Sequence, residues 1–165
     1  KMIAVLRERD MSDMRFRDKV ALAVRLRLDG IEDKEAVRRG ATLFALPHNA
    51  RLGAGLIWGT ADAIWTTLGD TSRDVNWYTK RATLSTVYST TVLYWLGDES
   101  PEYTATWSFL DRLINNVMQF EKLKSQVGAN KGLQNLMRGP NWILSKIKAP
   151  PSSRPSDMPG SWKQS

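Results

Sequence analysis

The chain has 165 residues, no cysteine and a formal net charge of +7 at pH 7. This length suits one domain that buries about 70% of its unfolded surface. The lack of cysteine excludes a disulfide framework, a thiolate metal site and a thiol nucleophile. Residues 121–165 carry 8 basic and 2 acidic side chains. This basic surplus is compatible with binding to nucleic acid or anionic lipid, and equally with a solvent-exposed segment.

Helical spacing dominates the first part of the chain. We expect a short piece at residues 2–10 and helices at 13–29, 33–46 and 49–68. Ser12-Asp13 is a plausible N-cap for the first of these helices, and Asn49 for the third. Pro47 should stop the second, because proline cannot continue a helix.

Residues 82–97 contain no charged side chain, although charged pairs flank them on both sides. Their apolar positions do not alternate in twos, so with the entrance 74–81 they predict a helix of about six turns. The run is shorter than the roughly 20 residues of a membrane span and is rich in Ser and Thr. We therefore expect a buried helix at the centre of the domain or at a dimer seam.

Ser100-Pro101-Glu102 combines an N-cap, a first-turn proline and an acid near the positive helix end, which predicts a helix to about Gln126. Residues 131–148 form a basic amphipathic segment that suits either a membrane surface or its own domain. From Pro150 the Pro/Ser-rich tail cannot build a core, and we expect it to be flexible. Nothing alternates as a strand, so the predicted class is all-α.

Common catalytic motifs are missing. His48 is the only histidine, which excludes zinc sites with two or more histidines and a di-iron site built from two Glu-x-x-His pairs. Its place in an interhelical connection favours a turn or packing role. There is no Gly-x-Ser-x-Gly motif, and the glycines after His48 miss the dinucleotide spacing. We predict no enzymatic activity and no metal site.

Two stripes carry competing interpretations. Gly55, Gly59 and Ala63 recur every four residues, which favours close approach of a neighbouring helix over an apolar ligand groove. A second stripe holds Asp74, Trp77, Tyr78 and Arg81 at i, i+3, i+4 and i+7. It predicts either a binding face with aromatic hot-spot residues or a capped helix start in which Arg81 stacks on Trp77.

Four stretches together resemble the COQ-nine family, the accessory proteins of ubiquinone biosynthesis. The likeness spans about residues 15–125, and its most specific part is Asn76-Trp77-Tyr78-Thr79-Lys80-Arg81. The stretches are Leu46-Pro47-His48-Asn49, Trp65 with Gly69-Asp70, Asp74 to Arg81, and Trp107-Ser108-Phe109-Leu110.

The resemblance implies a TetR-like, ligand-binding helical bundle that forms a homodimer. Members bind isoprenoid quinone intermediates or other lipids, need no cofactor, and assist the di-iron demethoxyubiquinone hydroxylase without being the catalyst. We then expect a lipid-binding and dimerisation domain at residues 1–128, a membrane-associating helix at 129–148 and a tail at 149–165. The implied location is cytoplasmic, peripheral on the inner membrane, and on the matrix side in a eukaryote.

The resemblance also assigns site residues. The hydroxylase-binding patch maps onto Ile64, Trp65, Asp74, Trp77, Tyr78 and Arg81. The lipid-binding residues are Leu43, Leu46, Leu56, Leu84 and Tyr88. The membrane-binding face of the terminal helix comprises Leu133, Leu136, Met137, Ile143, Leu144 and Ile147.

One departure from the family pattern concerns DNA. The family carries an N-terminal helix-turn-helix-like part, and nothing before Met14 is long enough to supply it, so no nucleic acid partner is expected for this chain. The alternative from another class is the effector-binding domain of a TetR-type transcription regulator whose DNA-reading part lies outside the sequence.

Overall fold

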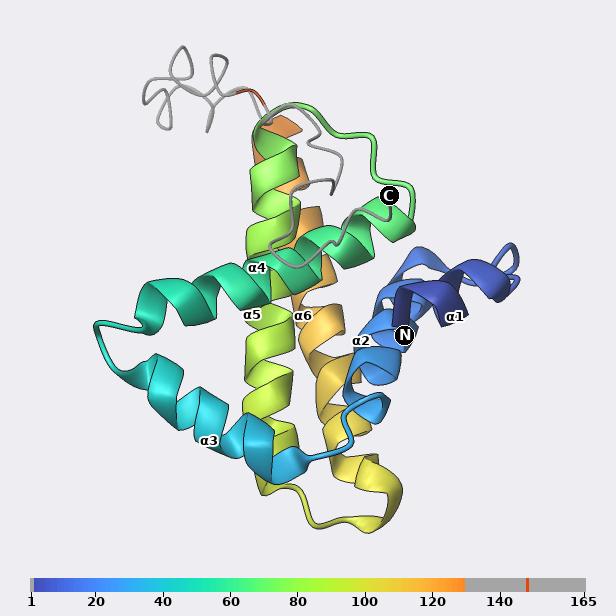
Figure 1. The fold of residues 1–165 in the computed structure, drawn as a ribbon. Helices are drawn as coiled ribbons and strands as arrows, with labels where there is room; N and C mark the ends of the chain where they lie inside the picture. Colours follow the sequence, from blue (N-terminus) through green and yellow to red (C-terminus); the bar gives the residue numbers. More distant parts are fainter. Residues whose placement is uncertain (1, 130–147, 149–165) are drawn as a thin grey trace, which may run out of the picture.

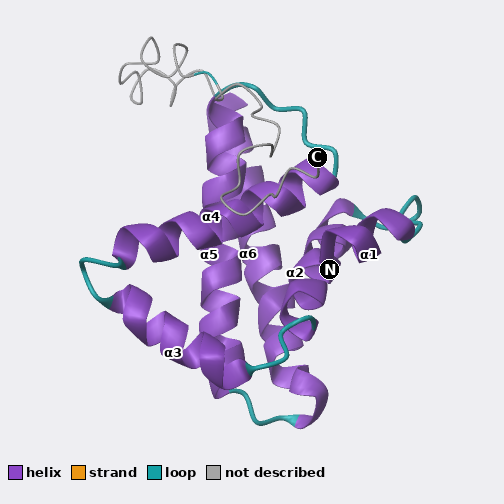
Figure 2. Cartoon of the chain, in the orientation of Figure 1, coloured by secondary structure: helices purple, strands orange, loops and turns teal. Residues whose placement is uncertain are grey.

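The computed structural model describes residues 2–129 and residue 148, with side chains described at 2–120 and 148. Every regular element in this part of the chain is helical (Figures 1 and 2), which confirms the predicted all-α class. The elements are α1 Met2–Glu8, α2 Phe16–Asp29, α3 Lys34–Ala45, α4 Ala50–Thr67, α5 Val75–Gly97, the short 3-10 turn η1 Pro101–Tyr103, and α6 Thr104–Ala129.

Side-chain caps fix the starts of α3 and α5. The Asp33 carboxylate accepts a hydrogen bond from the Ala36 N–H at 2.9 Å, and the Asp74 carboxylate accepts one from the Asn76 N–H at 3.0 Å. Each satisfies a backbone donor that has no partner within the helix. Asn49 occupies the predicted N-cap position of α4, but its side chain makes no cap hydrogen bond there.

Two helix starts differ from the prediction. α2 begins at Phe16, after a turn in which the Ser12 N–H donates to the Asp10 carboxylate at 2.9 Å. α6 begins at Thr104 because Glu102 and Tyr103 have positive φ angles of 51° and 55°. The predicted cap Ser100 still acts, since its hydroxyl accepts from the Ala105 N–H at 3.0 Å.

The charge-poor helix α5 lies at the centre of the bundle. α4 crosses it on one side and α6 runs along another, while α2 packs on α6 (Figure 1). One side of α5 remains open, because Leu93 is 64% exposed and Tyr94 is 40% exposed. The predicted burial therefore applies to most of the helix and not to this face. Its buried residues are Arg81, Leu84, Val87, Tyr88, Thr91, Trp95 and Leu96.

A buried carboxylate fixes the turn between α5 and α6. Asp98 accepts hydrogen bonds from the hydroxyl and the N–H of Thr106, at 2.5 and 2.9 Å, and from the Ser100 N–H at 2.8 Å. These hydrogen bonds, the one from the Thr106 hydroxyl foremost, hold the pKa of Asp98 well below its ordinary value. The turn thereby sets how α6 lies against α5.

Close helix approach occurs at Gly53, and not at the predicted stripe. A Cβ on Gly53 would lie 2.6 Å from the Cβ of Phe44 on α3, so the α3–α4 contact requires glycine. At Gly55 and Gly59 a Cβ would meet nothing within 4 Å. The expected close packing along Gly55, Gly59 and Ala63 is therefore wrong, because the side of α4 that carries these two glycines faces open space.

The predicted membrane-binding residues Leu133, Leu136, Met137, Ile143, Leu144 and Ile147, and the tail from 149, lie outside the described residues. Within the described helices, none combines the length and apolar character that crossing a bilayer requires.

Candidate functional site

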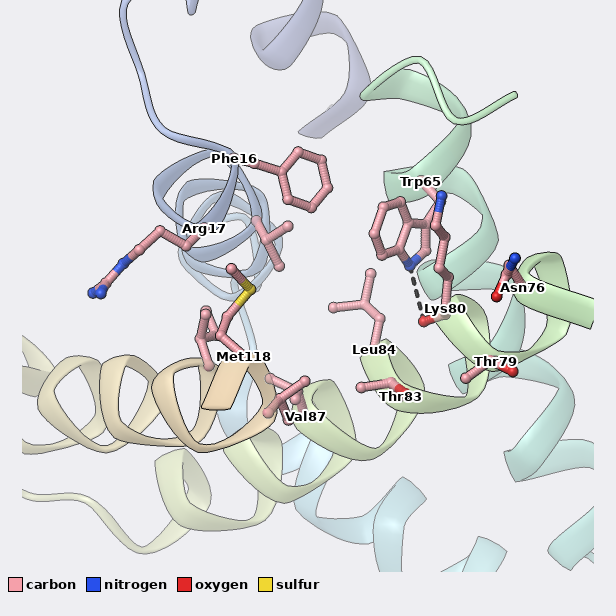
Figure 3. Close-up of a pocket in the computed structure, with 13 residues that line it drawn as sticks. Phe16, Arg17, Trp65, Asn76, Thr79, Lys80, Thr83, Leu84, Val87 and Met118 are labelled. Carbon is pink, nitrogen blue, oxygen red and sulfur yellow. Dashed lines mark hydrogen bonds between the residues drawn. The ribbon is translucent and has the colours of Figure 1, made fainter. Parts of the chain in front are cut away.

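A cavity of about 250 Å³ lies between α2, α4, α5 and α6 (Figure 3). Its walls are mainly aliphatic and aromatic, and its polar groups come mostly from α5. The lining residues are Phe16, Arg17, Val20, Trp65, Asn76, Thr79, Lys80, Thr83, Leu84, Val87, Ile114, Val117 and Met118.

One face of α5 forms the longest wall of the cavity. Its lining residues follow each other at alternating steps of three and one, so they share one helical stripe. Asn76, Thr79 and Lys80 line the N-terminal part of this stripe, and Leu84 and Val87 line the part further along. The α5 wall is therefore mainly polar near the start of the helix and mainly apolar beyond Thr83, which matches an amphiphilic molecule.

Two aromatic rings form the wall opposite. Phe16 of α2 stacks on Trp65 of α4, with ring centroids 5.2 Å apart. The Trp65 indole N–H donates to the Lys80 carbonyl at 3.0 Å, the dashed line in Figure 3. The Lys80 ammonium lies 5.2 Å from the centre of the Trp65 ring. This contact orients Trp65 and places a cation at the edge of the cavity.

A buried ion network lies behind this wall. The Asp70 carboxylate contacts the Lys80 ammonium at 2.7 Å and the Arg81 guanidinium at 2.9 Å. Arg81 also contacts Asp62 at 2.5 Å. Burial alone would raise the pKa of Asp70, but hydrogen bonds from Lys80, Arg81 and Ser72 outweigh it and hold that pKa well below its ordinary value. Asp70 is therefore ionised at neutral pH, and the network holds α4 against α5.

Three aromatic side chains gather on the other side of Arg81. The Trp77 ring lies 6.0 Å from Trp58 and 4.8 Å from Tyr78, and Trp58 lies 6.4 Å from Tyr78. The guanidinium of Arg81 stacks over Trp77 at 4.0 Å. All three aromatic side chains are half-buried. We call Trp58, Trp77 and Tyr78 the aromatic cluster.

The structure separates the predicted partner-binding residues into two groups. Asp74, Trp77 and Tyr78 reach the surface, and Trp65 is half-buried at the cavity. Ile64 is 0% exposed and Arg81 is 2% exposed, so neither can touch a partner in this arrangement. Arg81 turns inward because Asp62 and Asp70 bind it there. The stacking of Arg81 on Trp77, one of the two interpretations of this stripe, is confirmed.

The predicted lipid-binding residues do not come together. Leu84 lines the cavity, whereas Tyr88 is buried in the core, where desolvation raises the pKa of its hydroxyl. Leu43 lies on α3, Leu46 in the α3–α4 connection and Leu56 on α4. Each of them is at least 44% exposed. They miss the cavity because the α3–α4 hairpin projects away from α2 and α6 (Figure 1).

The lining residues that sequence reasoning missed come mostly from α2 and α6. Phe16, Val20, Ile114, Val117 and Met118 follow helical spacing, which marks them as inward-facing. Spacing alone cannot distinguish a filled core from a gap within it. The place of Trp58 in the aromatic cluster could not be predicted from its sequence position, because its partners Trp77 and Tyr78 belong to another helix.

Among the side chains that the structure describes, no group of three or more His, Asp or Glu is placed to hold a metal ion. The buried carboxylates Asp70 and Asp98 are instead bound by cations, hydroxyls and backbone N–H groups. What remains as a candidate site is the cavity and the aromatic cluster next to it.

Fold and site together define an all-α domain with an apolar, ligand-sized cavity. The profile of the COQ9 family matches residues 50–121, which include all of α4 and α5 and most of α6. The chain is also similar to the human protein named "Ubiquinone biosynthesis protein COQ9, mitochondrial", with 35% identity over 120 residues, 73% of this chain and 37% of that protein. The chain belongs to the COQ9 family.

Two further relatives show how much is shared. The rat protein of the same name is 36% identical over 120 residues, 73% of this chain and 38% of its own length. The Dictyostelium discoideum protein, named "Probable ubiquinone biosynthesis protein coq9, mitochondrial", is 31% identical over 143 residues, 84% of this chain and 44% of its own length. The chain thus spans less than half the length of each of these relatives.

Proposed function

We propose that this chain is a non-enzymatic accessory protein of ubiquinone biosynthesis that binds an isoprenoid quinone intermediate or another lipid. The observation that carries the proposal is the mainly apolar cavity between α2, α4, α5 and α6, with polar side chains along its α5 wall. The names of the COQ9 relatives support a role in ubiquinone biosynthesis.

Transfer between a bilayer and a protein sets the requirement for such a cavity. Each CH2 group that leaves an apolar environment for water costs roughly 0.8 kcal/mol. A polyprenyl chain therefore leaves the membrane only if another apolar space receives it. Pockets for drug-sized ligands measure roughly 300–1,000 Å³. The cavity of about 250 Å³ is close to the lower end of that range, so it suits the ring and the first part of a long tail.

The proposed recipient of the lipid is the di-iron demethoxyubiquinone hydroxylase at the membrane. The aromatic cluster is the docking surface, because Trp and Tyr dominate binding energy at protein interfaces. Arg81 stacks on Trp77 from behind and Lys80 of the same helix borders the cavity. The docking surface and the lipid are therefore on adjacent faces of α5, which suits delivery from one protein to the other.

We further propose a homodimer through the open side of α5. Leu93 and Tyr94 are exposed there, and Tyr94 stacks on Phe109 of α6 with ring centroids 4.3 Å apart. Leu93→Glu should convert the dimer to a monomer in sedimentation equilibrium. An unchanged molecular mass would show that the dimer does not form through this side of α5.

The proposed location is peripheral on the inner membrane, on the matrix side if the source is eukaryotic. The mitochondrial names of the relatives support it. Residues 131–148 are proposed as the membrane-associating helix, from their amphipathic sequence. Leu136→Glu and Ile143→Glu should lower the fraction of protein that floats with liposomes, and an unchanged fraction would remove this assignment.

The experiment that tests lipid binding is extraction of the purified protein with organic solvent, followed by mass spectrometry. The expected result is an isoprenoid quinone or another lipid in a stoichiometric amount. Protein that carries no apolar molecule, and that takes none up from vesicles loaded with ubiquinone, would contradict the proposal.

A further inference from the structure

The α3–α4 hairpin presents a surface that the proposed function does not use. Its connection lies at the edge of the molecule, away from α1, α2 and α6 (Figure 1). Four leucines around this connection, which we call the hairpin tip, are between 44% and 61% exposed. They are Leu43, Leu46, Leu52 and Leu56.

The tip is held in shape by its own contacts. The Asn49 N–H donates to the Leu46 carbonyl at 2.9 Å, and the Asn49 side-chain amide donates to the Leu43 carbonyl at 3.3 Å. Just behind the turn, Phe44 packs directly on Gly53. These contacts keep the two helices together, so the leucines point outward from a closed hairpin and not from an open loop.

The charge of the hairpin has one sign over most of its length. No acidic residue lies between Glu35 and Asp62, while Arg38, Arg39 and Arg51 are basic. Arg38 pairs with Glu35 and donates to the Leu96 carbonyl, and Arg39 pairs with Asp33 at 3.8 Å, so both belong to the base of the hairpin.

Arg51 is the basic residue of the tip. Among the described residues, none forms an ion pair with it. Arg51 and His48 border a shallow hollow whose other walls are Leu52, Gly55 and Leu56. A hollow with a basic edge and an apolar floor matches the phosphate and the upper acyl chain of an anionic phospholipid.

We propose that the hairpin tip inserts its leucines into the surface of a membrane that contains anionic phospholipid. This is a second membrane contact, separate from residues 131–148 and from the lipid cavity. A projecting tip with exposed leucines and an arginine beside them buries apolar area at the acyl boundary and keeps the guanidinium at the phosphates. A protein partner is less well matched, because leucine is under-represented among interface hot spots.

Because the chain has no cysteine, a single cysteine can carry an environment-sensitive fluorophore. Leu52→Cys places the label at the tip, and Ser108→Cys, exposed on α6, is the control. With vesicles of phosphatidylcholine and phosphatidylglycerol, we expect a blue shift and higher intensity at position 52 and no change at 108. Three outcomes would overturn the proposal: vesicle binding without a response at 52, no vesicle binding, or a response at 52 to purified hydroxylase but not to vesicles.

Substitutions test the same contact by affinity. Burying half of a leucine side chain changes partitioning by about five- to tenfold, so Leu52→Glu with Leu56→Glu should weaken vesicle binding by at least that factor. Leu52→Met with Leu56→Met should bind like the parent. Arg51→Gln should lose about fivefold in affinity for anionic vesicles and nothing for neutral ones. Equal binding by the Glu and Met variants would contradict the proposal, whatever lipid the cavity holds.

Discussion

The guanidinium of Arg81 and the carboxylate of Asp70 meet at 2.9 Å, with side chains only 3% and 1% exposed. This pair joins the start of α5 to the loop after α4, and both parts of the candidate site depend on it. On one side Asp70 binds Lys80, which borders the cavity, and on the other side Arg81 supports Trp77. The ion pair therefore positions the lipid cavity and the aromatic cluster relative to each other.

Asp70→Asn should lower the free energy of unfolding by about 3 kcal/mol, because it leaves Arg81 and Lys80 without their shared buried anion. Urea denaturation followed by circular dichroism measures this. Asp18→Asn is the matched control, since Asp18 pairs with Arg15 and Arg17 in partly exposed positions and its loss should cost less than about 1 kcal/mol. Similar losses for the two variants would show that the buried network does not hold α4 to α5.

Acid should destabilise the protein through the same carboxylate. The pKa of Asp70 in the folded chain lies below its ordinary value of 3.8. The stabilisation is therefore complete above about pH 5 and is lost as the pH falls below about 4. Unfolding free energies measured from pH 5 downward should decline for the parent and decline less steeply for Asp70→Asn. Parallel pH curves would contradict the assigned role of Asp70.

Two glycines of α4 should respond in opposite directions to alanine. Gly53→Ala forces a methyl group against Phe44 and should cost about 1–3 kcal/mol, as overpacking does. Gly59→Ala meets open space and should stabilise the helix by roughly 0.5–1 kcal/mol. Thermal unfolding of both variants checks the prediction. A stable Gly53→Ala protein would mean that α3 does not pack on α4 as described.

The aromatic cluster should carry the binding of the hydroxylase. Trp58→Ala or Tyr78→Ala should each weaken binding by about thirtyfold if these residues are hot spots. Trp107→Ala, a half-buried aromatic on α6 outside the cluster, is the control. Isothermal titration calorimetry with the purified hydroxylase measures the affinities. Loss of binding in the control alone would place the interface on α6.

Local chemistry made much of the fold predictable. The capped start of α5 at Asp74 was one of the two predicted interpretations, because a cap acts on N–H groups two or three residues away. The second helix was expected to begin at residue 33, and the structure shows that Asp33 caps it. The start of α6 was missed, since the positive φ angles at Glu102 and Tyr103 have no signature in these residue types.

The candidate site was less predictable because it depends on distant contacts. The helical spacing of Trp77, Tyr78 and Arg81 was correct, yet Arg81 turns inward toward Asp62 and Asp70, which lie outside α5. Likewise the exposed leucines of the hairpin have the character of core residues. Only the arrangement of the helices determines which apolar side chains enclose the cavity.

The cavity between α2, α4, α5 and α6 is the proposed lipid site, and filling it tests lipid binding directly. Thr83→Trp fills the cavity from its α5 wall, and Thr42→Trp makes the same change at an exposed position on α3. Circular dichroism first confirms that both variants fold. Lipid extracted from equal amounts of each protein is then quantified by mass spectrometry. We expect Thr42→Trp to retain the lipid of the parent and Thr83→Trp to lose it. Equal lipid in the two variants would show that the cavity does not hold the lipid.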